Sequence, residues 1–225
     1  TPVVAFFAGA PKLAAMVLFA RLLAEGFGGA AEQWRQVLIL IALLSIAVGA
    51  FAGLVQKNLK RLWAYSSIAN VGYAVLGLAA GDAQGVQSML MFMVLYMIDV
   101  TGFFACLTAL SRDGRPMETI EDMAGLVKER PGLALAMTAF SLSALGLPPF
   151  SGFWAKLYVF KAAIGAGLGV EQAHRGLTTY DMLIEDVPTR DVARPTVVEN
   201  LWLCPATTDL SSADIALVSN EKRSF

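Results

Sequence analysis

Long apolar runs fill the first three quarters of the chain, and few charges interrupt them. A helix needs about 20 residues to cross a bilayer, and the turn signals and polar faces of soluble helices are missing from these runs. The pattern therefore predicts an all-α polytopic membrane protein fragment with about five transmembrane helices, one or two of them broken at proline. The predicted spans are Val3–Leu23, Val37–Val55, Leu62–Ala80, Val86–Leu110 and Leu133–Leu157, the last extending towards Ile164.

Composition supports the membrane prediction and excludes several other classes. Hydrophobic residues make up 56% of the 225 positions and charged residues 16%, whereas soluble domains have about 25% charged residues. No segment carries the dense basic patch of a nucleic-acid surface. Cys106 and Cys204 form no motif, so a disulfide or metal framework is not expected. The chain begins at Thr1 without a charged leader and is interpreted as an internal fragment.

The short connections predict which ends of the helices face the cytoplasm. The second and fourth connections are rich in Lys and Arg, whereas the third, around Gly81–Gly85, has neither. Because basic loops stay in the cytoplasm, the first helix should start on that side and the fifth should end outside. Inside the fourth connection, Thr119–Glu129 is expected to form a short amphipathic helix with a capping box of Thr119 and Asp122.

From about residue 169 the character of the chain changes. Residues 1–168 have a net charge of +3 and residues 169–225 one of −4. Leu177–Asp186 and Ser211–Phe225 are expected to be helical, with a short strand at Asn200–Pro205. We therefore expect two regions: a transmembrane region over 1–168, and over 169–225 a soluble, α/β-like tail too small for a complete core.

Three ionisable residues lie inside the apolar runs: Lys12, Asp99 and Lys156. A charge there costs roughly 2.5–3.5 kcal/mol on insertion scales, so each is a candidate functional residue. Proline accompanies both lysines, at Pro11 and at Pro148-Pro149. Broken helices mark ion sites in transporters, and a lysine stripped of water releases its proton more easily. Lys12 and Lys156 are thus predicted to relay protons, and the shared proline-lysine pattern suggests an internal repeat.

Each assignment has a structural alternative. Both lysines can extend to the membrane surface, and Asp99 can pair with a lysine or only hydrogen-bond a neighbouring helix. Lys60 is an orientation anchor in the main interpretation and a gating or relay residue in the other. Tyr65-Ser66-Ser67 are expected to cap the third helix.

Three segments resemble subunit N of bacterial NADH-quinone oxidoreductase, respiratory complex I. They are PVVAFFAGAPKLAA, QKNLKRLWAYSSIANVGY and LSALGLPPFSGFWAKLYVF, within residues 1–168. The resemblance implies a proton-translocating subunit of about fourteen helices without a redox centre, in the bacterial inner membrane. It also implies NADH and quinone as substrates of the complex, other membrane subunits as partners, and no cofactor in this chain. Lys12 and Lys156 match the lysines of the eighth and the broken twelfth helices. Asp99 stands where relatives often have an uncharged polar residue.

The tail resembles a different family. Residues 167–225 are similar to the segment that follows the nucleotide-binding loop of ParA-type chromosome-partitioning ATPases, and G-x-x-x-x-G-K-[ST] is missing from them. ATP hydrolysis by the tail alone is therefore not expected, and the two resemblances together suggest a chimera. The alternatives to a pump subunit are a subunit of a multisubunit cation/proton antiporter, a partitioning-ATPase fragment with a spurious membrane extension, and a non-functional chimeric fragment.

Overall fold

The computed structural model describes residues 2–112, 115–167 and 177–206. Contacts divide the chain into two compact units, Thr1–Ile164 and Gly165–Phe225. The expected boundary at 168/169 stays a prediction, because it falls where the structure does not describe the chain. Each unit is described separately below.

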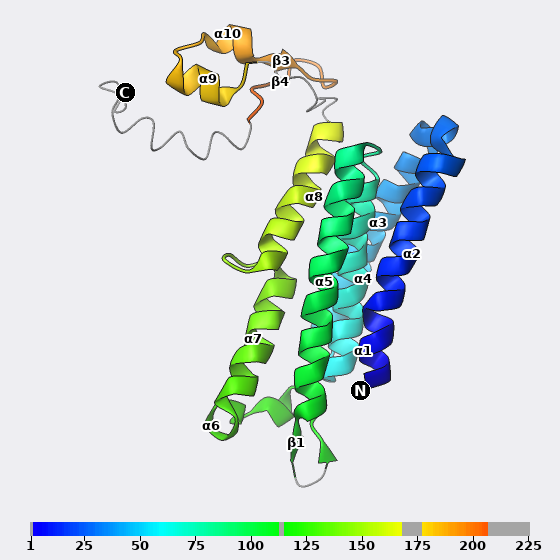
Figure 1. Ribbon diagram of the computed structural model, residues 1–225, viewed down its shortest axis with the longest axis vertical. Coiled ribbons are helices and arrows are strands. Elements are labelled where there is room, and N and C mark those ends of the chain that lie inside the picture. The colour runs from blue at the N-terminus through cyan, green and yellow to red at the C-terminus, as the bar shows by residue number, and fades with distance from the viewer. Residues whose placement is uncertain (1, 113–114, 168–176, 207–225) are drawn as a thin grey trace. The chain divides into compact units, whose positions relative to one another are not determined.

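The first unit is a bundle of helices that run alongside one another (Figure 1). Its longer helices are α1 (Pro2–Ala8), α2 (Ala10–Arg21), α3 (Ala31–Leu54), α4 (Leu59–Leu78), α5 (Ala83–Ala109), α7 (Pro131–Leu145) and α8 (Ser151–Gly167). The connections hold a π-helix (Leu22–Gly26), 3-10 turns (Gly28–Ala30 and Glu121–Met123), the hairpin strands β1 (Ser111–Arg112) and β2 (Arg115–Pro116), and α6 (Leu126–Glu129).

Within the described residues, three helical stretches are long and apolar enough to cross a membrane: Pro2–Gly26, Gly28–Leu54 and Ala83–Ala109. They coincide with the first, second and fourth predicted spans. Helix α4 coincides with the third predicted span, but Ser66, Ser67 and Asn70 make it more polar than the other three helical stretches. The predicted fifth span is divided between α7 and α8.

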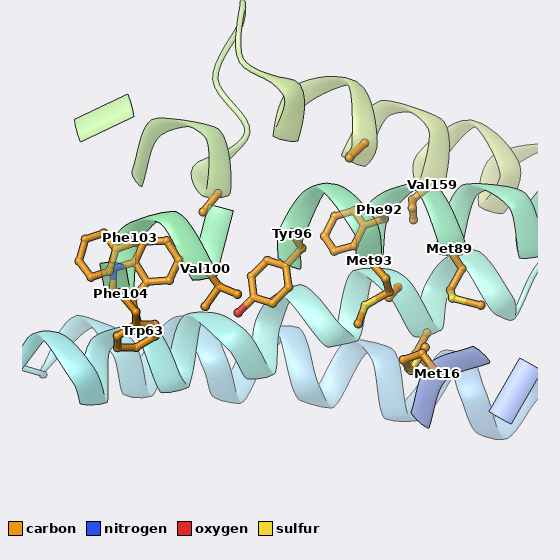
Figure 2. Packing of buried hydrophobic residues seen from close by; sticks show 14 of the residues in the cluster. Met16, Trp63, Met89, Phe92, Met93, Tyr96, Val100, Phe103, Phe104 and Val159 are labelled. Atoms are coloured by element: carbon orange, nitrogen blue, oxygen red, sulfur yellow. The ribbon is translucent and has the colours of Figure 1, made fainter. Parts of the chain in front are cut away.

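The core of the bundle surrounds α5. Large apolar side chains of this helix are fully or nearly fully buried, and Trp63 of α4 stacks on Phe103 with ring centroids 4.1 Å apart (Figure 2). Many apolar side chains on the outside of the bundle are exposed, among them Phe51 and Leu135, each 73% exposed. Exposure of this kind suits helices whose outer surface meets lipid.

Small residues allow α3 and α4 to pack closely, as expected in membrane helices. A Cβ atom added to Gly49 would lie 2.6 Å from the backbone nitrogen of Ala69, and one added to Gly72 would lie 2.9 Å from Cγ1 of Ile46. Gly53 is different, because the nearest atom to its added Cβ is 3.8 Å away. The two helices therefore approach each other more closely at Gly49 and Gly72 than at Gly53.

Both predicted helix breaks are present. The first separates α1 from α2 at Gly9, directly before Ala10 and Pro11. The second follows α7, which ends at Gly146 with φ of +90°, a conformation that glycine adopts without a steric penalty. Proline then keeps the chain from continuing as a helix until Ser151.

Two local predictions were wrong. Tyr65-Ser66-Ser67 lie inside α4, which begins at Leu59 and is capped by Asn58, whose side chain accepts from the amides of Lys60 and Arg61. The predicted start at Leu62 is too late, because the Asn58 cap includes Lys60 and Arg61 in the first turn of the helix.

The predicted helix Thr119–Glu129 is two short turns instead of one helix. The two hydrogen bonds of the predicted capping box are present. The Thr119 amide donates to Asp122 Oδ2 over 2.8 Å, and the Asp122 amide donates to Thr119 Oγ1 over 3.2 Å. Gly125, with φ of +82°, then interrupts the helical backbone before α6.

In the second unit, the described residues form α9 (Thr179–Ile184), α10 (Thr189–Val192) and an antiparallel pair of strands, β3 (Arg194–Pro195) and β4 (Trp202–Leu203). Helix α9 lies in the segment expected to be helical, and β4 lies in the segment expected to be a strand. The expected helix at Ser211–Phe225 lies outside the described residues. Two strands of two residues each do not support the predicted α/β fold.

Candidate functional site

A row of polar side chains passes through the middle of the bundle. Five helices contribute to it, and Ser67, Asn70, Asp99 and Ser143 in it are at most 5% exposed. Its members are Lys12 on α2, Ser67 and Asn70 on α4, Tyr96 and Asp99 on α5, Ser143 on α7 and Lys156 on α8.

Lys12 marks one end of the row. The break at Gly9 starts a new helix immediately before it, and the Lys12 amide bonds back to the Gly9 carbonyl over 3.1 Å. Its Nζ donates a hydrogen bond to Ser67 Oγ across the bundle. The lysine is therefore directed into the protein interior, and this contact favours the relay interpretation over a side chain that extends to the membrane surface.

Asp99 occupies the centre of the row. It is 5% exposed, and its Oδ2 accepts a hydrogen bond of 2.8 Å from Ser143 Oγ. Ser143 Oγ also lies 3.1 Å from Ser151 Oγ and accepts from the Gly152 amide over 3.2 Å. Asp99 thus bonds to a neighbouring helix, as one of the two sequence interpretations expected, and Ser143 joins α5 to both sides of the helix break.

Lys156 marks the other end and binds the broken helix itself. Its Nζ donates to the carbonyls of Ala144 over 3.0 Å and Leu145 over 2.8 Å. The last carbonyls of a helix lack partners within the helix and carry partial negative charge, so they suit a cation. Nζ also lies 4.9 Å from the centre of the Tyr73 ring, and Lys156 lines the same small cavity as Asp99. The break at Gly146 therefore creates the binding site for this ammonium group.

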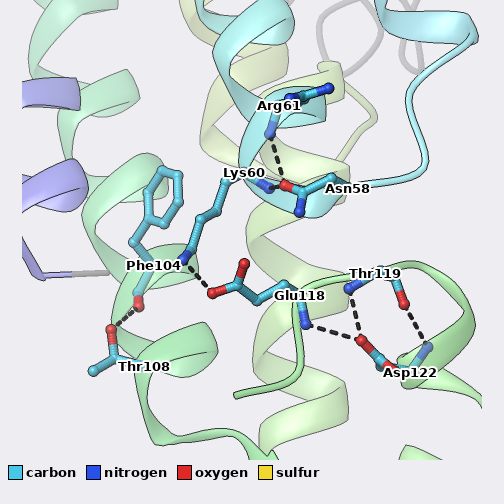
Figure 3. Close-up of polar contacts among 8 residues, drawn as sticks. All are labelled: Asn58, Lys60, Arg61, Phe104, Thr108, Glu118, Thr119 and Asp122. Atoms are coloured by element: carbon cyan, nitrogen blue, oxygen red, sulfur yellow. Dashed lines mark hydrogen bonds and ion pairs between the residues drawn. The ribbon is translucent and has the colours of Figure 1, made fainter. Parts of the chain in front are cut away.

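Lys60 lies apart from the row, at the end of the bundle where α4 begins (Figure 3). It forms an ion pair with Glu118, and this hydrogen-bonded contact lowers the pKa of the Glu118 carboxyl. Backbone bonds complete the contact: the Leu59 amide donates to the Glu118 carbonyl over 2.8 Å, and the Ile120 amide donates to the Lys57 carbonyl over 3.0 Å. We name residues 57–60 and 118–120 the latch.

The structure brings together Asp99 and Lys156, connects Lys12 to the row through Ser67, and leaves Lys60 in the latch. Sequence reasoning missed Tyr96, Ser143 and Glu118, and misread Ser67. The sequence contains a pattern that could have identified Ser67 and Tyr96. Ser67 precedes Asn70 by three residues, and Tyr96 precedes Asp99 by three residues. Residues three apart share a helix face, so each pair places polar groups on one side of an apolar helix.

Broken helices with ionisable side chains packed between them define a class of protein: polytopic helical membrane proteins of the antiporter-like type. The chain belongs to the family described as NADH:quinone oxidoreductase/Mrp antiporter, transmembrane, whose model matches residues 1–174.

Its relatives include NADH-quinone oxidoreductase subunit N of Caulobacter sp. (strain K31), which is 75% identical over 167 residues, covering 74% of this chain and 35% of that protein. The chain spans about a third of the length of the curated relatives it matches.

Solved structures show the same relationship. A chain of respiratory complex I from Thermus thermophilus with bound aureothin is 40% identical, with a TM-score of 0.52 over 59% of this chain and 30% of that one. A chain of the Mrp complex from Dietzia sp. DQ12-45-1b is 27% identical, with a TM-score of 0.65 over 72% of this chain and 30% of that one.

Proposed function

We propose that residues 1–168 are part of a proton-translocating membrane subunit of NADH-quinone oxidoreductase. The row of polar side chains from Lys12 to Lys156 supports this proposal most strongly, because it places two lysines and a carboxyl group along one path through an otherwise apolar bundle. The name of the subunit N relative supplies the reaction, an oxidoreduction between NADH and quinone, and the coupling of that reaction to proton movement is part of this proposal.

In this proposal Lys12 is the central relay and Lys156 lies near the exit half-channel, with Asp99 between them. Lys156 can hold a proton against the carbonyls of α7 and the charge of Asp99, and can release it when either contact loosens. Lys60 has no direct bond to the row among the described residues, so its role is to hold the latch.

We also propose that the bundle crosses the membrane five times. Three crossings are the long apolar stretches Pro2–Gly26, Gly28–Leu54 and Ala83–Ala109, and the other two are α4 and the α7–α8 pair. The latch places the basic α3–α4 connection beside the basic segment before α7. Because basic loops remain in the cytoplasm, this end of the bundle faces the cytoplasm of a bacterium and the bundle lies in its inner membrane.

The chain itself is proposed to carry no redox centre and no cofactor, and to be inactive without the rest of its complex. NADH and quinone would bind other parts of that complex, and other membrane subunits and lipid would cover the apolar outer surface. Protons are the species that this subunit would move.

Replacing either lysine in the complete subunit, within its complex, tests the proposal. Removing a group that transfers protons costs roughly 10²-fold or more in general acid–base catalysis, so Lys12→Ala and Lys156→Ala should each slow coupled NADH oxidation at least tenfold. Subunit content of the purified complex checks that assembly is unchanged. If neither replacement slows the coupled reaction, the proposal is wrong.

The second candidate is a subunit of a cation/proton antiporter without redox coupling. The likeness to a chain of the Mrp complex supports this candidate. The support is weaker than for the first candidate, because the identity is 27% to the Mrp chain and 75% to the subunit N relative. Sodium-dependent proton movement in sealed vesicles without NADH would support the antiporter, whereas strict dependence on NADH oxidation would support the pump subunit.

For the tail we retain the proposal of a ParA-like fragment joined to the membrane region. Sequencing single unbroken molecules of source DNA across codons 150–190 tests the junction. If no molecule carries the junction, residues 1–168 belong to an ordinary subunit. If the junction is intact, the fusion is real and the chain is either a non-functional fragment or a new combination of two regions.

A further inference from the structure

Tyr96 is a buried polar side chain without a partner. It is 4% exposed, and among the described residues its hydroxyl forms no hydrogen bond. Buried side-chain hydroxyls almost always have a partner, either in the protein or in an ordered water molecule. An unpaired hydroxyl in the middle of a bundle therefore indicates a group that binds something small and polar.

A small cavity adjoins Tyr96. It has a volume of about 10 Å³ and is lined by, among others, Asn70, Tyr96, Asp99, Ser143 and Lys156. A bound water needs roughly 10–15 Å³ and two to four polar partners. The Tyr96 hydroxyl, the Asp99 carboxylate and the Asn70 amide supply such partners, so the size and the chemistry of the cavity both suit one water molecule.

Tyr96 also occupies the gap between the two ends of the polar row. Its ring extends from α5 between Phe92 and Val100, with the hydroxyl directed towards α4 (Figure 2). Ser67 of α4 holds Lys12, and Asp99 lines the same cavity as Tyr96 and Lys156. The row is therefore continuous only if Tyr96 takes part in it.

We propose that one water molecule binds in this cavity, between the Tyr96 hydroxyl and Asp99, and that Tyr96 with this water carries protons between Ser67 and Asp99. The inference rests on the proposed pumping function and adds a residue and a water site to it. Asp99 takes a proton from the water, the water takes the Tyr96 proton, Tyr96 takes the Ser67 proton, and Ser67 takes one from the Lys12 ammonium. Lys12 ends neutral and Asp99 ends protonated, while each hydroxyl and the water regain one proton.

Tyr96→Phe tests the inference in the complete subunit within its complex, because it removes only the hydroxyl. Coupled NADH oxidation should fall roughly tenfold or more, and the ratio of rates in H₂O and D₂O should rise as proton transfer becomes limiting. Tyr158→Phe is the matched control: its side chain lies on α8 and is 39% exposed, so both quantities should stay unchanged.

The possible results separate this inference from the function on which it rests. Suppose that Lys12→Ala and Lys156→Ala slow coupled NADH oxidation. Equal rates and equal isotope ratios for Tyr96→Phe and Tyr158→Phe would then overturn the inference about Tyr96 and leave the proposed function intact. If the lysine variants are as fast as the unaltered complex, the proposed function fails first.

If Tyr96→Phe does not assemble, a high-resolution map of the unaltered complex decides. Ordered density at hydrogen-bonding distance, about 3 Å, from Tyr96 Oη supports the water site, and an empty cavity overturns it.

Discussion

The charge of the half-buried Lys156 is stabilised by a set of contacts that depends on one glycine. A charge at the centre of a membrane helix costs roughly 2.5–3.5 kcal/mol on insertion scales. Two carbonyls at the end of α7, the charge of Asp99 and the ring of Tyr73 oppose that cost. A Cβ atom on Gly146 would lie 2.9 Å from Cδ of Lys156, so only glycine leaves room for the lysine chain beside this left-handed turn.

At Asp99, replacing the carboxyl by an amide keeps the size of the side chain but removes its ability to take a proton. Asp99→Asn in the assembled complex should slow coupled NADH oxidation roughly tenfold or more. Asp82→Asn is the control: it removes a carboxylate from the N-cap of the same helix, and asparagine caps equally well. If Asp99→Asn is as fast as Asp82→Asn, then Asp99 has only a structural role.

At the scale of the elements, the sequence predicted the helices better than their ends and connections. Runs of apolar residues located every long helix, and Pro148-Pro149 located the break before α8. The latch was missed because it pairs Asn58 with Thr119, far apart in the chain, through a backbone bridge that no local pattern encodes. Ser143 was missed because its role depends on the position of Asp99 on another helix.

Packing of α3 against α4 predicts a strong difference between two glycines. In Gly49→Ala the new methyl would lie 2.6 Å from the Ala69 nitrogen and 2.7 Å from the Tyr65 carbonyl oxygen, and the helices must move apart. Overpacking of this kind costs about 1–3 kcal/mol, so the thermal inactivation midpoint of the complex should fall.

Gly53→Ala is the matched control on the same helix, since its added methyl lies 3.8 Å from the nearest atom. Both replacements gain the same helix propensity. A Gly49→Ala complex that inactivates at the same temperature as Gly53→Ala would show that α3 and α4 are not closely packed at Gly49.

The latch predicts a pH-dependent effect. Lys60 lowers the pKa of Glu118, so the stabilisation is fully present above the ordinary glutamate pKa of about 4.3 and is lost as the pH falls through the lowered value. Glu118→Gln should therefore reduce hydrogen-exchange protection of the Leu59 and Ile120 amides by roughly twofold at pH 7, as is typical of an ion pair near the protein surface.

The difference in hydrogen-exchange protection between Glu118→Gln and the unaltered protein should persist down to about pH 5. It should narrow only below the ordinary glutamate pKa of about 4.3. Glu121→Gln, an equal loss of charge on the same connection, should leave both amides protected. Identical exchange in the two variants would contradict the latch.

At the scale of the whole molecule, the sequence distinguished a membrane region from a polar tail, and the structure divides the chain after Ile164. Hydrophobicity alone was enough for the first region, because a bilayer imposes length and polarity on every crossing. The tail is too short to reveal a fold through its pattern, and its described residues form only short elements. The proposed function of the membrane region depends on a polar row whose members come from five separate helices, which explains why only its charged members, Lys12, Asp99 and Lys156, were predicted.

Proton translocation by the lysine variants tests the central claim most directly. In sealed vesicles that contain the complete complex, protons moved and NADH oxidised are measured together for Lys12→Ala, for Lys156→Ala and for Lys161→Ala, a control five residues further along α8. The account predicts that the first two variants lose most NADH-driven proton translocation while the control keeps it. Unchanged translocation rates and an unchanged ratio of protons to electrons in Lys12→Ala and Lys156→Ala would contradict it.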